Sequence, residues 1–75
     1  MNKEILAACG LALYGTQWKS ALAADLGVNL RSLRRWVDGD VVPPDRLRRE
    51  LFKLLSDRVD EIETVKHELL NAELG

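Results

Sequence analysis

Three arginines that stand close together, Arg31, Arg34 and Arg35, are the side chains with the clearest chemical potential in this chain. A guanidinium group can donate two parallel hydrogen bonds to guanine O6 and N7, or to phosphate oxygens, so the cluster is a candidate for binding nucleic acid. Arginines on a short helix are more often a solvated surface, and a short motif alone carries a high false-positive risk. The surrounding elements therefore decide between these two interpretations.

No other set of side chains in the sequence predicts catalysis or metal binding. Cys9 is the only cysteine and His67 the only histidine, so one chain can form neither a disulfide nor a zinc site. Ser56 and His67 are eleven residues apart, which on a helix separates them by more than about 15 Å, too far for nucleophilic catalysis. We expect no enzyme activity, metal or cofactor, with Cys9 buried and His67 at the surface.

Length and composition predict one small globular domain over residues 1–75. The chain is 47% hydrophobic and 31% charged, with a formal net charge of −1. Residues 1–49 hold eight lysines or arginines against five acidic residues, a charge of +3, whereas residues 50–75 hold three against seven, a charge of −4. The basic part could face phosphate while the acidic part points away from it.

The N-terminal apolar segment predicts neither membrane insertion nor secretion. The uncharged run from Ile5 to Trp18 is shorter than the roughly 20 residues that span a bilayer. Only Ile5 separates the charged start from the segment Leu6–Cys9, which has the residue types of a lipoprotein cleavage site, so the apolar part of a signal peptide is missing. We expect no membrane association and a cytoplasmic location, with which a single thiol agrees.

The hydrophobic periodicity predicts an all-α fold of four to five helices. The first is expected over residues 3–13, with Asn2 as its N-cap, and the second over residues 17–25, with Thr16 as its N-cap. The apolar stripe expected on the first helix consists of Ile5, Ala8, Cys9 and Ala12, widened by Leu6 and Leu13. The stripe expected on the second consists of Leu22, Ala23 and Leu26.

Two further helical segments are expected in the second half of the chain. One covers residues 30–37, with Asn29 as its N-cap and Gly39 just past its end. The other extends over residues 45–73, where no glycine or proline interrupts the apolar period. This last segment is either one long helix or two helices, because Ser56 could cap a new one.

The segment of residues 16–38 has the residue types that a helix-turn-helix motif requires. Ala23 is small where two helices would touch, and Gly27 tolerates the positive φ of a tight turn. The apolar residues expected to fill the space between the helices are Leu22, Leu26, Val28, Leu33 and Trp36. This spacing predicts two helices at roughly a right angle, the arrangement that presents the second helix to a DNA major groove.

The segment Leu22–Asn29, followed by Leu33–Gly39 and Pro43, resembles the Cro and lambda-repressor-type helix-turn-helix family. Members commonly read Leu-Ala-x-x-Leu-Gly-Val-Ser, then a short helix ending in Arg-Trp, two further residues, a glycine and a proline. Asn29 stands in the place of the usual serine, and asparagine also caps helices well. The resemblance implies a small transcriptional regulator that binds operator DNA, a repressor of phage, plasmid or bacterial origin.

The resemblance also implies which side chains contact DNA. Ser32, Leu33 and Trp36 are expected to turn inward, which leaves the other face of the helix at the positions that contact DNA in the family. The expected DNA-binding residues are Gln17, Lys19, Asn29, Leu30, Arg31, Arg34 and Arg35. Base edges are expected to meet Arg31 and Arg34, with a thymine methyl near Leu30. Phosphates are expected to meet Arg35, Lys19 and Gln17, and these roles could exchange.

The C-terminal helix carries more apolar residues than one small core needs. Those expected to complete the core are Leu47, Leu51, Phe52, Leu54 and Leu55. The later ones, Val59, Ile62, Val65 and Leu69, either pack back on the first helix or pair with a second copy of the chain. In the second case one row of the seam would be Phe52, Val59 and Lys66, and the other Leu55, Ile62 and Leu69, with the lysine as an imperfection.

The sequence thus predicts a homodimer that reads double-stranded DNA in the major groove and regulates transcription, most simply as a repressor. A twofold dimer would read half-sites about one DNA turn apart. The alternative is a protein–protein interaction module, such as an antitoxin-like adaptor, that binds a protein partner through its acidic C-terminal helix. A pure adaptor would bind DNA too weakly to depend on its sequence.

Overall fold

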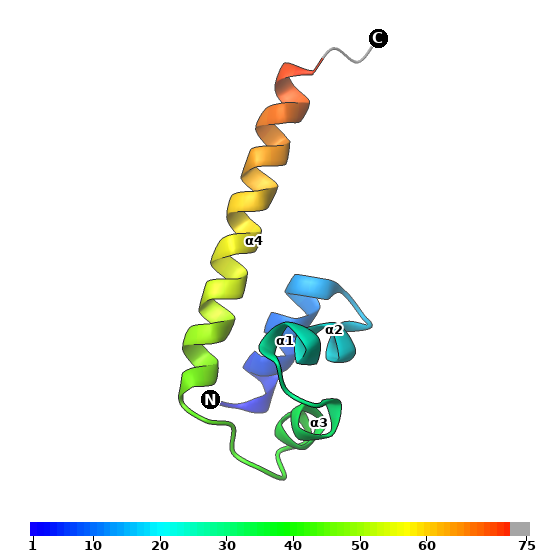
Figure 1. Cartoon of the computed structure of the whole chain (residues 1–75), viewed down its shortest axis with the longest axis vertical. Helices are drawn as coiled ribbons and strands as arrows, with labels where there is room; N and C mark the ends of the chain where they lie inside the picture. Colours follow the sequence, from blue (N-terminus) through cyan, green and yellow to red (C-terminus); the bar gives the residue numbers. More distant parts are fainter. Residues whose placement is uncertain (73–75) are drawn as a thin grey trace.

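The computed structural model describes residues 1–72, and over this range the only regular elements are helices (Figure 1). They are α1 (Lys3–Tyr14), α2 (Trp18–Leu26), α3 (Leu30–Asp38) and α4 (Arg46–Asn71). The first three pack together, and α1 also packs against the first part of α4. We call α1, α2, α3 and residues 39–58 the body. The rest of α4 projects from it alone, within overall dimensions of 52 × 21 × 21 Å. The predicted small all-α bundle with a long C-terminal helix is confirmed.

The ends of α1 are fixed by Asn2 and Gly15. The Asn2 side-chain Oδ1 accepts a hydrogen bond from the Ile5 backbone N–H at 2.8 Å, which confirms the predicted N-cap. Gly15 follows the last residue of the helix with φ 82°, and its N–H donates to the Leu11 carbonyl at 2.9 Å. The helix ends one residue later than predicted.

The apolar stripe predicted for α1 is confirmed only in part. Its exposed members are Ile5, Ala8 and Ala12. Leu6 and Leu13, which were expected to widen the stripe, are buried, and Cys9 is half-buried. The buried residue that was not predicted is Gly10. The buried face is centred on Gly10 because the Trp18 ring packs there: a Cβ atom added to Gly10 would lie only 2.0 Å from a ring carbon. A glycine adds nothing to a hydrophobic pattern, so the periodicity could not locate this contact.

α2 begins at Trp18, one residue later than predicted, and Thr16 is not its N-cap. Gln17 occupies the N-cap position, and its side chain makes no capping hydrogen bond. The Trp18 side chain is only 5% exposed, so packing against α1 sets the start of this helix. The predicted stripe on α2 is confirmed, with Leu22 and Ala23 buried and Leu26 half-buried.

The core combines residues from all four helices. Its buried members are Leu6, Leu13, Trp18, Leu22, Ala23, Leu33, Leu47 and Leu51. Of the other residues expected to complete the core, Leu54 and Leu55 are half-buried, but Phe52 is 73% exposed. The prediction for Phe52 is wrong because the next residue along a helix is rotated by about 100°, away from the face of Leu51. Cys9 is half-buried rather than buried, and this burial raises the pKa of its thiol.

α4 is a single helix, which settles the choice between one helix and two. Ser56 lies in its interior, and Asp45 is at its N-cap position. The predicted end at Glu73 lies outside the described residues. None of the helices within residues 1–72 has both the length and the apolar character needed to cross a membrane.

Arg58 marks the point where α4 leaves the body. Its Nη1 donates a hydrogen bond to the Leu13 carbonyl at the end of α1, and its guanidinium lies 5.6 Å from the centre of the Tyr14 ring. The Tyr14 hydroxyl donates to the Asp25 carboxylate on α2. Burial, together with this hydrogen bond, raises the pKa of Tyr14 to about 12. Beyond Arg58, every residue of α4 from Val59 onward is exposed.

Candidate nucleic-acid interface

A three-residue turn, Gly27 to Asn29, joins α2 to α3. Gly27 has φ 68° and ψ 29°, in the left-handed region where glycine carries no Cβ penalty, as the sequence predicted. The Val28 N–H donates to the Ala23 carbonyl at 3.0 Å, which satisfies one of the last carbonyls of α2. Ala23 is 4% exposed, and α2 and α3 contact each other. The turn therefore fixes α3 closely against α2.

Both ends of α3 are well defined. The Asn29 side-chain Oδ1 accepts a hydrogen bond from the Ser32 N–H at 2.7 Å, which confirms the predicted N-cap. At the other end Gly39 adopts φ 83°, and the Asp40 N–H donates to the Arg35 carbonyl at 3.0 Å. These bonds hold a helix of nine residues that would be marginal by itself.

The inner face of α3 is anchored in the core. Leu33 is fully buried, and Trp36 and Val37 are half-buried against the core cluster. Ser32 is half-buried, in agreement with its predicted inward position. Leu30, predicted to lie outside, is also half-buried and packs against the core, so that prediction is wrong in part. Only the remainder of its side chain is available to a ligand, because the helix rotation turns Leu30 toward Leu33.

The outer face of α3 presents three arginines to solvent. Arg31, Arg34 and Arg35 are all exposed, and their spacing of three and four residues places them on one side of the helix. Within residues 1–72 none of them forms an ion pair, and Asp38 is the only acidic residue of α3. Like charges at this spacing repel one another by about 0.2–0.5 kcal/mol per pair. An anionic surface would relieve this repulsion.

Gln17 and Lys19, the other predicted phosphate contacts, lie at the start of α2 and are exposed. The Lys19 ammonium lies 5.9 Å from the centre of the Trp18 ring, near the outer limit of a cation–π contact. The structure brings the three arginines together on α3. Among the described residues, none of these arginines forms a hydrogen bond with Gln17 or Lys19.

A second basic group was missed by the sequence reasoning. Arg46, Arg48 and Arg49 open α4 and are all exposed, although Arg46 is 3.5 Å from Glu50 in an ion pair. The start of α4 and α3 lie toward the same end of the molecule, opposite the C-terminal end of α4 (Figure 1). The repeated arginines at positions 46–49 were visible in the sequence, but only the fold shows which end of the molecule carries them.

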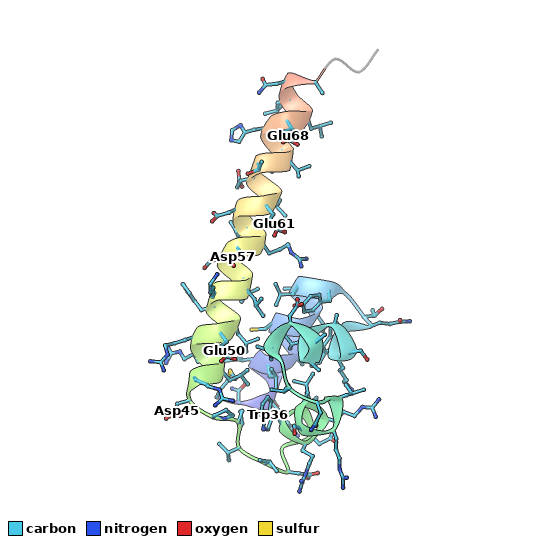
Figure 2. The ribbon with its side chains drawn as sticks, viewed as in Figure 1. Trp36, Asp45, Glu50, Asp57, Glu61 and Glu68 are labelled. Atoms are coloured by element: carbon cyan, nitrogen blue, oxygen red, sulfur yellow. The ribbon has the colours of Figure 1, made fainter. Side chains whose placement is uncertain are left out.

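The projecting part of α4 has the opposite character. Its exposed apolar residues Val59, Ile62, Val65 and Leu69 remain 52–60% accessible. The prediction that they pack back on the first helix is therefore wrong, and pairing with a second copy stays a prediction. Acidic side chains, among them Glu61 and Glu68, extend along the same part of the helix (Figure 2). His67 is exposed there, as predicted.

Comparisons of the chain with protein-family models, with curated proteins and with solved structures gave no significant match.

Proposed function

We propose that this chain binds double-stranded DNA in a sequence-specific manner through α3 and acts as a small transcriptional regulator. The observation that carries the proposal is the outer face of α3, where Arg31, Arg34 and Arg35 are exposed and form no ion pair with any described residue. A helix that is anchored on one side and carries arginine on the other suits insertion into a major groove.

The charge distribution also favours an orientation in which α3 faces the DNA. The +3 charge of residues 1–49 lies in the body. The −4 charge of residues 50–75 lies mainly in the projecting part of α4. α3 lies at the end of the molecule away from the acidic tip of α4 (Figure 1). A phosphate backbone would attract the end that carries α3 and repel the other end, which favours one approach to DNA.

Each exposed side chain has a role that its chemistry suits. Arg31 and Arg34 would pair with guanine edges, because the guanidinium fork matches O6 and N7. Arg35, Lys19 and Gln17 would contact phosphates and fix the register of the body on the duplex. The resemblance to Cro and lambda-repressor-type proteins agrees with this assignment and favours a repressor that occupies an operator as a homodimer.

The test begins with selection from a pool of randomised duplexes, followed by affinity measurements on the selected sequence at two salt concentrations. Recovery of a defined site, with affinity that falls steeply with salt, is the expected result. Replacing Arg31 or Arg34 by alanine should lower affinity for that site by about 10- to 100-fold each. Arg35→Ala should weaken binding to all sequences and reduce the salt slope by about 1.

The matched control removes a positive charge that lies away from α3. Lys53 is exposed on α4, so Lys53→Ala should leave affinity for the selected site close to that of the unchanged protein. The proposal is overturned if no sequence is enriched over random DNA. It is also overturned if the double variant Arg31→Ala with Arg34→Ala binds the selected site as tightly as the unchanged protein.

A second candidate function, a protein-binding module, is favoured by the exposed apolar and acidic side chains of the projecting part of α4. An adaptor of this kind would use α4 to hold a partner, as an antitoxin does, and would bind DNA weakly without sequence preference. The selection experiment separates the two functions, because only a DNA reader enriches a defined site.

A further inference from the structure

The apolar face of α4 continues beyond the end of the body with regular spacing. Its members recur at alternating intervals of three and four residues, the repeat of a two-stranded coiled coil. They are the apolar residues Phe52, Leu55, Val59, Ile62 and Leu69, with Lys66 as the one polar member, and of these only Leu55 is half-buried and the rest are exposed. An isolated row of this kind leaves apolar surface in water, so a partner that covers it would stabilise the helix.

The N-terminal part of this row lines a hollow of about 330 Å³ on the surface of α4. It is lined by Phe52, Leu55, Ser56, Val59 and Asp60. The lining is apolar along the row and polar only at its edge, which suits an apolar side chain from a second helix. The row is thus accessible beside the body as well as beyond it.

We propose that this row pairs with the same row of a second copy of the chain, in register and with the two α4 helices parallel. The pairing itself is independent of DNA binding. Only the consequence that two paired chains would bind two half-sites of one operator rests on the proposed function.

The charges that flank the row favour the parallel arrangement. In a parallel coiled coil, a residue just before one core position lies near the residue five places later in the other chain. This rule pairs Arg58 with Glu63 of the second copy, twice by symmetry, and pairs Val65 with Leu70. Both pairs are complementary, one in charge and one in apolar character. In one chain, Glu63 and Leu70 are both exposed and Arg58 is half-buried.

Arg58 retains donors for such a contact. Its Nη1 donates to the Leu13 carbonyl and its Nε lies 3.5 Å from Glu61, but a guanidinium has five N–H groups. The second terminal nitrogen has no hydrogen bond to any described residue. Glu63 lies 3.4 Å from Lys66 through one carboxylate oxygen, and the other oxygen can accept from an arginine.

An antiparallel pair in the register that opposes Val59 and Leu69 is less complementary. Aligning Val59 with Leu69 of the second copy would bring Glu63 next to Glu63, and like charges at a close contact oppose association. It would also set Lys66 against Ile62. The parallel register instead places the two lysines side by side, and a single polar residue at such a core position selects one register at a cost in stability.

Lys66 therefore makes the pairing specific but weak. Each ammonium has Glu63 of its own chain 3.4 Å away, which offsets part of the repulsion between the two lysines. A parallel pair places both copies of α3 at the same end of the dimer, where they can meet one face of a duplex. A weak dimer would form more completely on DNA that carries two half-sites than in free solution.

The orientation is tested on the full chain with a cysteine at the seam. Leu69→Cys, in a Cys9→Ala background, should form a disulfide-linked dimer on mild oxidation because parallel pairing brings the two residues 69 together. In the antiparallel pair that opposes Val59 and Leu69 they would be about 15 Å apart along the axis, too far for a disulfide. The control, Glu68→Cys in the same background, lies on the other side of α4 and should remain monomeric on gels.

Sedimentation equilibrium tests the pairs themselves, without DNA. Lys66→Leu should tighten the dimer about tenfold or more. Glu63→Lys should weaken the Lys66→Leu dimer several-fold by facing Arg58, whereas Glu68→Lys, with the same change of charge, should not. Monomers for Lys66→Leu overturn the pairing, and a dimer without a Leu69→Cys crosslink overturns the parallel orientation. Since DNA is absent, failure here leaves the test of DNA binding separate.

Discussion

The contact between Gly10 and Trp18 determines how α1 and α2 pack. The tryptophan ring lies directly over the glycine, with three ring carbons 2.0–2.7 Å from where a Cβ atom would be. Trp18 is also the first residue of α2, so this contact sets the start of that helix and, through the turn at Gly27, influences where α3 lies. The arginine surface thus depends on a glycine in another helix.

Gly10→Ala should therefore destabilise the protein. Alanine favours a helix interior by about 1 kcal/mol over glycine, but the added methyl group has no room beside a buried ring. Overpacking of this kind costs about 1–3 kcal/mol, so we expect a net decrease in the free energy of unfolding measured in urea. The same substitution in a Trp18→Leu background should lose its penalty. An equal decrease in both backgrounds would show that the ring is not the cause.

For single residues, the sequence predicted the backbone and capping roles correctly where these follow from the residue's own chemistry. Gly27 with its positive φ, the Asn2 and Asn29 caps, and buried Leu33 are all confirmed. The residues it misplaced are those whose burial depends on a neighbour. Ile5 and Phe52 are apolar but face solvent, since the core of a chain this small covers only one side of each helix.

α3 and α4 differ greatly in length and in what stabilises them. α3 has nine residues and depends on its caps and on Leu33, whereas α4 has 26 residues and extends about 39 Å. The sequence predicted where both lie but left the continuity of α4 open. A serine followed by acidic residues is typical of a helix start, and the same residues are also tolerated within a helix. Packing of Leu51, Leu54 and Leu55 on one side of the helix favours continuity.

Ser56→Ala tests this continuity. In the interior of a helix alanine is preferred over serine, so we expect the free energy of unfolding to rise by roughly 0.5 kcal/mol. If Ser56 capped a second helix, the same change would lower stability by about 1 kcal/mol. Urea denaturation gives the sign, and circular dichroism gives the helix content. Thr64→Ala, which also removes a hydroxyl from the interior of α4, is the matched control and should not reduce the helix content.

The whole molecule is more extended than a compact chain with the same number of residues. Its radius of gyration is 15.1 Å, whereas a compact chain of this length would have about 11 Å. The extra length comes from the projecting part of α4, which contributes no buried residue to the core of a single chain. Such a helix separates a basic body from an acidic, apolar tip (Figure 2). The proposed pairing of two α4 helices would cover this projecting part.

Substitution of Ile62, in the row of α4 proposed to pair, should disrupt pairing without affecting the contact between α3 and DNA. Ile62 is 52% exposed in the single chain, so Ile62→Lys should leave the body folded while placing a charge between two α4 helices. We expect affinity for a duplex with two half-sites to fall about a hundredfold, toward that for a duplex with one, because the gain from divalent binding is lost. Affinity for the single half-site should be unchanged within error, since α3 is untouched. Thr64→Lys adds the same charge on the opposite side of α4 and should preserve the preference for two half-sites. Equal affinities of Ile62→Lys and the unchanged protein for the longer duplex would mean that each chain reads DNA alone.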